Sequence, residues 1–218
     1  MKKIIVAPSI LSADFNNLLS DIKAVENGGA EWLHFDVMDG HFVPNISFGV
    51  PVLKSIAHSH KMVNDVHIMI SDPLKYAPEF IKCGAEYLTF HYEACKDDAE
   101  VEKVIDLIHE LGGKAGMSIK PKTEVGVCDK FLPKLDLLLV MSVEPGFGGQ
   151  SFIPSALDKI SYLRKLIDTN KYHCLIEVDG GINHETGKLC KDAGVDVLVA
   201  GSYLFGHEDI NERIKGLR

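Results

Sequence analysis

The feature that most restricts the fold of this chain is a regular alternation of short apolar segments with segments of helical spacing. The apolar segments are rich in β-branched and aromatic residues and have the length of strands. They cover residues 4–10, 32–38, 62–70, 87–91, 114–119, 135–143, 173–179 and 195–200. Alternating strands and helices form a parallel sheet, and eight such units in 218 residues favour an α/β fold closed into a (β/α)8 TIM barrel. An open doubly wound sheet is the alternative.

Helices are predicted between these strands. The first is expected to be capped by Ser12 or Asp14 and to end near residues 27–29. The others cover residues 50–58, 73–81, 98–111, 155–168, 184–193 and 209–215, with a short helical turn at 124–128. Because no linker, low-complexity segment or charge block interrupts this order, residues 1–218 are expected to form a single barrel domain.

The composition restricts the possible partners. A net charge of −8 argues against nucleic acid as the main partner, and no apolar run reaches the length of a membrane span. The five cysteines are scattered and contain no C-x-x-C pair, which is typical of reduced thiols in the cytoplasm. The first eight residues, which include two lysines, are interpreted as the start of a strand rather than as a signal peptide.

The second strand carries polar side chains in an unusual place. Side chains alternate between the two faces of a strand, so His34, Asp36 and Met38 share one face while the residues between them are apolar. Burying an imidazole and a carboxylate without partners costs several kcal/mol or so each. A bound metal ion is the simplest compensation.

Further polar residues fall at the carboxyl ends of strands, where the active sites of such barrels lie. Four of them make a plausible ligand set for one divalent metal: His34, Asp36, His67 and Asp179. Two imidazoles and two carboxylates suit zinc, iron, manganese or cobalt, and the residue types do not choose among these. Asp65 shares a face with His67 but lies deeper in the strand, so it is expected to support a ligand by a hydrogen bond.

Glycine-rich loops follow the last three strands. Their backbone N–H groups can approach a phosphate closely, as in many barrels of this type. The residues concerned are Gly146, Phe147, Gly148 and Gly149 after the sixth strand, Gly180 and Gly181 after the seventh, and Gly201 and Ser202 after the eighth. No lysine or arginine adjoins these loops in the sequence, so we expect amides to hold the phosphate.

Three methionines are predicted to point into the barrel near the same end: Met38, Met69 and Met141. Methionine usually fills gaps in a core. Around a metal, these side chains could also form a soft, dry wall that strengthens electrostatic effects in the site.

Four segments together resemble the ribulose-phosphate 3-epimerase family. They are APSILSADF at 7–15, HFDVMDGHFVPN at 34–45, PGFGGQSF at 145–152 and VDGGI at 178–182. The resemblance extends over essentially the whole chain. It departs from the commoner family pattern at Lys120, where many members have asparagine, and at Ile68, where leucine is commoner.

The resemblance implies a barrel that interconverts D-ribulose 5-phosphate and D-xylulose 5-phosphate in the pentose phosphate pathway. It implies one divalent metal on the four residues named above, with Asp36 and Asp179 as the acid/base pair. Ser9 would contact the substrate, together with His67 and the three methionines, and the glycine loops would bind the phosphate. Loop 146–149 is expected to order over the bound substrate.

The chemistry of such a reaction agrees with this arrangement. Inverting a carbinol carbon beside a ketone requires removal of a proton from one face and return of a proton to the other. Two carboxylates on different arcs of the barrel could alternate as base and acid, while a metal stabilises the negative charge on the substrate oxygens.

Other functions remain open at this level. The same site could serve a six-carbon ketose phosphate such as allulose 6-phosphate. A metal-free phosphate-binding isomerase or lyase, or a non-catalytic sugar-phosphate-binding barrel, are more distant alternatives. A homo-oligomer formed through the helices is expected, but no exposed apolar stripe distinguishes a dimer from a hexamer.

Overall fold

The computed structural model describes residues 3–218, so Met1 and Lys2, which were predicted to belong to the start of the first strand, lie outside the described residues. Eight parallel strands pair in the order β1-β8-β7-β6-β5-β4-β3-β2. Their bounds are β1 Ile5–Pro8, β2 Trp32–Met38, β3 Val63–Met69, β4 Tyr87–His91, β5 Lys114–Ile119, β6 Leu137–Met141, β7 Leu175–Asp179 and β8 Val197–Ala200. A parallel bridge between Ser9 and His34 joins β1 to β2. The ring therefore closes, and the predicted (β/α)8 barrel is confirmed rather than the open sheet.

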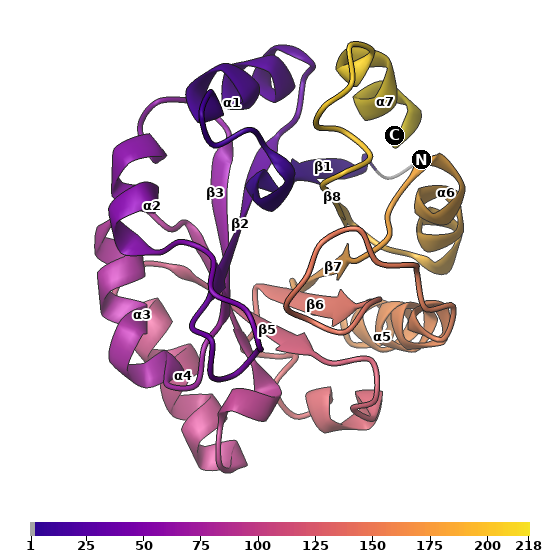
Figure 1. Cartoon of the computed structure of the whole chain (residues 1–218). Helices are drawn as coiled ribbons and strands as arrows, with labels where there is room; N and C mark the ends of the chain where they lie inside the picture. The colour runs from indigo at the N-terminus through magenta and orange to yellow at the C-terminus, as the bar shows by residue number, and fades with distance from the viewer. Residues whose placement is uncertain (1–2) are drawn as a thin grey trace.

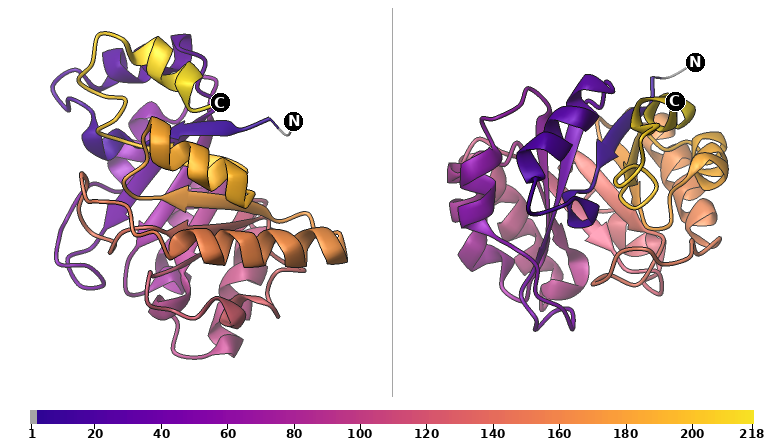
Figure 2. Two further views of the ribbon diagram at one scale, coloured as in Figure 1. Left: turned by 90° about the vertical axis from the view of Figure 1, so that its right-hand side faces the viewer. Right: turned by 45° about the horizontal axis from the view of Figure 1, so that its top comes forward.

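The helices form a layer around the outside of the strands (Figures 1 and 2). They are α1 Leu18–Asn27, α2 Val50–Ile56, α3 Pro73–Lys82, α4 Asp98–Glu110, α5 Ala156–Asn170, α6 His184–Ala193 and α7 Ile210–Gly216. After β5 the chain makes only the short 3-10 helix η3 Val125–Cys128, as predicted. Two more 3-10 helices, η1 Ile10–Ser12 and η2 Tyr92–Ala94, follow β1 and β4. No helix within residues 3–218 combines the length and apolarity needed to cross a membrane.

The predicted start of the first helix was wrong. Ser12 is the last residue of η1, which Ser9 caps by accepting a hydrogen bond from the N–H of Leu11. The Asp14 carboxylate accepts hydrogen bonds from the N–H of Asn16 and the side chain of Asn17, which closes a turn instead of starting a helix. The α-helix α1 therefore begins after Asn17.

The two faces of β2 separate as predicted. Leu33, Phe35 and Val37 pack in the large core between the strands and the helices. The opposite face points into the barrel, whose lower interior is filled by apolar side chains such as Leu137 and Val197. At the carboxyl ends of the strands this filling gives way to polar residues, and the site lies there.

Candidate active site and metal centre

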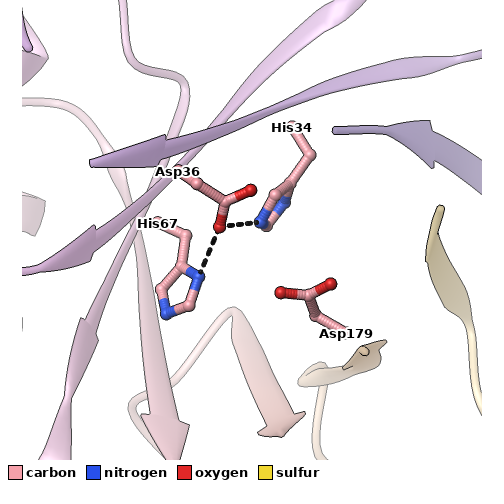
Figure 3. A group of neighbouring side chains, drawn as sticks. All are labelled: His34, Asp36, His67 and Asp179. Carbon is pink, nitrogen blue, oxygen red and sulfur yellow. Dashed lines mark hydrogen bonds and ion pairs between the residues drawn. The ribbon is translucent and has the colours of Figure 1, made fainter. Parts of the chain in front are cut away.

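The four predicted metal ligands lie together at the carboxyl end of the barrel (Figure 3). His34 and Asp36 come from β2, His67 from β3 and Asp179 from β7. Each of the four offers one ligand atom, and these atoms all lie within 4.8 Å of one another. Residues from distant parts of the chain thus converge because neighbouring strands of a parallel barrel end at the same level.

Asp36 is the centre of this group. Its Oδ1 atom lies 3.3 Å from Nε2 of His34 and 3.2 Å from Nδ1 of His67. Its other oxygen accepts a hydrogen bond of 2.6 Å from the Ser9 hydroxyl. Ser9 therefore fixes the carboxylate from the side opposite the two histidines.

The two carboxyl groups differ in charge. Burial alone would raise the pKa of Asp36, but the charge and hydrogen bond of His34, with those of His67, hold this pKa well below its usual range. Burial, and then the negative charge of Asp36, raises the pKa of Asp179 to about 7. Near neutral pH, Asp36 is thus an ionised base and Asp179 is able to carry a proton.

The donor set fits a divalent transition metal. Nδ1 of His34 lies 2.5 Å from Asp65 Oδ2, which leaves Nε2 as the atom that faces the site. Apart from its contact with Asp36 Oδ1 at 3.3 Å, this buried Nε2 has no hydrogen-bond partner in the part of the chain that the structure describes. Two imidazoles and two carboxylates suit zinc, iron, manganese or cobalt. The predicted supporting role of Asp65 agrees with its contact to His34.

A cavity of about 550 Å³ opens above the four residues. Of the residues predicted for substrate and catalysis, all except His67 line it, and the lining ones are Ser9, Asp36, Met38, Met69, Met141, Gly146, Phe147, Gly148, Gly149, Asp179, Gly180, Gly181, Gly201 and Ser202. His34 and His67 are fully buried and lie behind the cavity wall. Both carboxylates therefore face the cavity, while the imidazoles contact Asp36 from behind.

Gly181 and Gly201 are among the positions at which the glycine loops have no room for a side chain. A Cβ on Gly181, whose φ is +64°, would lie 2.5 Å from the backbone nitrogen of Phe152. A Cβ on Gly201 would lie 2.5 Å from the hydroxyl of Ser12. Glycine at these positions lets the loops after β6, β7, β8 and β1 approach one another around one end of the cavity.

Comparison with known proteins agrees with this geometry. The profile of the Ribulose-phosphate 3 epimerase family matches residues 5–205. The chain belongs to the ribulose-phosphate 3-epimerase family. It is 48% identical over 214 residues to the ribulose-phosphate 3-epimerase of Bacillus subtilis, covering 98% of this chain and 97% of that one. The enzyme of the same name from Synechocystis is 45% identical over 217 residues, covering 100% of this chain and 94% of that one.

Solved structures of more distant proteins share the barrel of this epimerase-family chain. The 3-keto-L-gulonate-6-phosphate decarboxylase from Vibrio cholerae superposes with a TM-score of 0.73 at 14% identity, over 100% of this chain and 96% of that one. The 3-hexulose-6-phosphate synthase from Salmonella typhimurium has a TM-score of 0.67 at 18% identity, over 98% and 96%. At such low identity, these likenesses concern the fold.

The sequence pattern of this epimerase-family chain did not predict a basic residue at the glycine end of the cavity. Arg213 of α7 lines the cavity, although no basic residue adjoins the glycine loops in the sequence. Its Nε donates to Asp209 at 2.7 Å and one of its NH groups donates to the carbonyl of Tyr203 at 3.1 Å. The packing of α7, the last helix, brings the positive charge of Arg213 to the cavity. No local sequence pattern predicts this position of Arg213.

Two groups of buried polar residues were missed as parts of the site. Glu177 lies 3.8 Å from Nδ1 of His34, and burial, with the charge of Asp65, raises its pKa well above the ordinary value. Its spacing of two from Asp179 repeats the spacing of His34 and Asp36, and that repetition was a usable signal. The second group is His91, a polar residue at a strand end to which the sequence pattern gave no role, and Glu93: His91 contacts His67 from the other side, and Glu93 contacts His91.

Proposed function

We propose that this chain is a ribulose-phosphate 3-epimerase that interconverts D-ribulose 5-phosphate and D-xylulose 5-phosphate. The observation that carries the proposal is the pair of carboxyl groups, Asp36 and Asp179, that line one cavity from different arcs of the barrel, so that one can act as base while the other acts as acid. A two-base inversion at C3 needs this combination of one base and one acid.

In this mechanism, the ionised Asp36 removes the C3 proton from one face of the substrate. Asp179, protonated in turn, delivers a proton to the opposite face. In the reverse direction the two carboxyl groups exchange roles. The Ser9 hydroxyl, 2.6 Å from Asp36 Oδ2, holds the base in position and can turn to a substrate oxygen.

We further propose that His34, Asp36, His67 and Asp179 hold one divalent cation, which is zinc, iron, manganese or cobalt. A bound cation of this kind supplies a Lewis acid that stabilises negative charge on substrate oxygens. Met38, Met69 and Met141 exclude water from the same side of the cavity, which strengthens the electrostatic effects of the carboxylates.

The phosphate is proposed to bind at the glycine end of the cavity. Backbone N–H groups of Gly146 to Gly149, Gly180, Gly181, Gly201 and Ser202 would face it, and the charge of Arg213 would attract it. The Phe147 side chain is 55% exposed at the cavity, which suits a loop that orders over the bound sugar.

Three features of the cellular form are also proposed. Residues 1–218 act as one barrel domain, because pairing of β1 with β8 joins the two ends of the fold. The protein works in the cytoplasm, where the free state of its five cysteines is maintained.

The protein self-associates through exposed apolar side chains such as Leu19, Ile46 and Leu189. Sedimentation velocity measures this self-association.

Proton NMR in D2O tests the reaction directly. Deuterium should enter C3 of D-ribulose 5-phosphate as D-xylulose 5-phosphate forms, and both processes should stop when the metal is removed by chelation. Exchange that survives complete metal removal would contradict the metal's role. Absence of exchange with intact ligand binding would favour a six-carbon substrate, for which allulose 6-phosphate is the competitor to add.

A further inference from the structure

A second row of buried groups leads away from the site, starting at His67. Nε2 of His67 lies 2.9 Å from Nε2 of His91, which is the last residue of β4. Nδ1 of His91 lies 3.2 Å from Oε2 of Glu93 in η2. Both imidazoles are fully buried, so these contacts are shielded from water. This row has no part in the mechanism above.

Glu93 is held as an acceptor at the outer end of the row. Its other oxygen, Oε1, accepts a hydrogen bond of 2.7 Å from the N–H of Lys120 and a short one from the Thr123 hydroxyl. The segment that supplies these donors is itself fixed, because Nζ of Lys159 donates to the carbonyls of Lys120, Pro121 and Thr123. Glu93 therefore occupies a rigid position from which Oε2 can only accept from His91.

The positions of the hydrogen atoms in this row follow from Glu93 at its outer end. Oε2 of Glu93 requires a hydrogen on Nδ1 of His91, so the Nε2 atom of neutral His91 is an acceptor. The two facing Nε2 atoms then share a single hydrogen, which must sit on His67. This leaves Nδ1 of His67 with its lone pair directed at the site, 3.2 Å from Asp36 Oδ1. Two acceptors that converge in this way repel each other unless a cation lies between them.

The opposite arrangement of the hydrogen atoms would cause a comparable repulsion between His91 and Glu93. If Nδ1 of His67 donated to Asp36, His91 would have to donate through Nε2 and would turn a bare Nδ1 toward the Glu93 carboxylate. That repulsion would persist whether or not the site held a cation. The carboxylate at the end of the row thus selects the histidine tautomer that can bind a metal.

We propose that His91 and Glu93 are positioning residues that fix the tautomer of His67 for metal binding. The inference rests on the proposed role of His67 as a metal ligand. It follows the general rule that the second ring nitrogen of a metal-binding histidine is held by an outer partner. Here the partner is a second histidine, which passes the preference of Glu93 from β4 to the neighbouring strand β3.

The variant Glu93→Gln tests this inference without changing the shape of the side chain. Its amide oxygen should face the two fixed donors, Lys120 N–H and Thr123 Oγ1, so its NH2 group must face Nδ1 of His91. The hydrogen bonds between Glu93, His91 and His67 then all reverse their direction, and Nδ1 of His67 acquires a hydrogen. Glu124→Gln is the matched control, because it removes an exposed carboxylate beside Thr123 and leaves His91 untouched.

Affinity for Zn²⁺ is measured by competition with a chromophoric chelator. Glu93→Gln should bind Zn²⁺ about 10–100-fold more weakly than the unmodified protein, while Glu124→Gln should bind it equally well. Long-range ¹H–¹⁵N spectra of the zinc-loaded unmodified protein should show the hydrogen of His67 on Nε2. These spectra do not depend on whether a variant folds.

The outcomes distinguish the positioning role of His91 and Glu93 from the proposed metal site and the proposed epimerase. Unchanged Zn²⁺ affinity in folded Glu93→Gln, or a hydrogen on Nδ1 of His67, would overturn the positioning role and leave the proposed epimerase intact. Absence of Zn²⁺, Co²⁺ and Mn²⁺ binding in the unmodified protein would overturn the proposed metal site and this inference with it.

Discussion

At the scale of single residues, the site depends on the difference between two aspartates in one barrel. Asp36 lies beside the imidazoles of His34 and His67 and accepts a hydrogen bond from Ser9, whereas Asp179 faces mainly another negative charge. The same burial therefore yields a base in one case and an acid in the other. Separation of pKa values between paired groups is what acid/base catalysis requires.

The variants Asp36→Asn and Asp179→Asn should each lower kcat by about 10²–10⁴-fold, because an amide neither accepts nor delivers the C3 proton. A coupled assay for D-xylulose 5-phosphate measures the loss. Near-normal turnover in either variant would contradict its assignment, provided that the variant binds metal.

Metal affinity should depend on pH around neutrality. In the metal-free protein Asp179 holds a proton below about pH 7, and a metal ligand must give that proton up. The affinity for the metal should therefore fall as the pH drops from 8 to 6, and proton release should accompany metal binding at the lower pH. Calorimetry in two buffers of different ionisation enthalpy counts the released protons. Equal affinity at pH 6 and pH 8 would contradict the raised pKa of Asp179.

The four ligand-type residues and the supporting Asp65 could be predicted from the sequence, but the contacts of Glu177 and His91 with the two histidines could not. His34, Asp36, His67 and Asp179 were identifiable because they interrupt apolar strands near their ends. The contact between His67 and His91 could not be derived in the same way. It depends on the register of β3 and β4 and on side-chain rotamers, which no local pattern encodes.

At the scale of the elements, the loops after the strands share one packed arrangement. The side chain of Asn45, after β2, donates a hydrogen bond of 2.8 Å to the carbonyl of Gly146, after β6. The loop after β6 also folds on itself, since Gln150 Nε2 donates to the carbonyls of Glu144 and Phe147. The cavity wall is therefore built from loops that constrain one another.

The variant Gly181→Ala should disturb this arrangement. Its Cβ would approach the Phe152 nitrogen to 2.5 Å at a φ of +64°, so the expected loss of stability is about 1–3 kcal/mol, with a raised KM for the sugar phosphate. Thermal unfolding and steady-state kinetics measure the two effects. Gly126→Ala is the control, because no atom lies within 4 Å of its added Cβ. Equal melting temperatures for the two variants would argue against close packing at Gly181.

The elements were predictable to different degrees. The existence and order of all eight strands followed from apolar periodicity. The start of α1 did not, because Asp14 and Asn17 can serve equally well in a turn or at a cap, and their contact with each other decides between the two. The approach of Arg213 to the cavity also depends on helix packing, which sequence spacing does not describe.

At the scale of the whole molecule, metal binding should stabilise the barrel. Ligands from β2, β3 and β7 converge only in the folded state. A ligand present at 100 times its Kd stabilises such a state by about 2.7 kcal/mol. For a chain of this length that corresponds to a rise in Tm of roughly 5–11 °C. Calorimetric scans with Zn²⁺ and with a chelator measure the difference, and identical scans would contradict binding at this site.

The closure of the barrel also has a consequence for biosynthesis. β1 is the first strand of the barrel to leave the ribosome, yet its partner β8 is the last. Val6 and Ala7, both fully buried in the finished fold, have no neighbour on that side until translation has passed residue 200. We therefore expect the nascent chain to keep an open sheet edge throughout elongation. Closure of the barrel is therefore a late step of folding, which waits for the last strand.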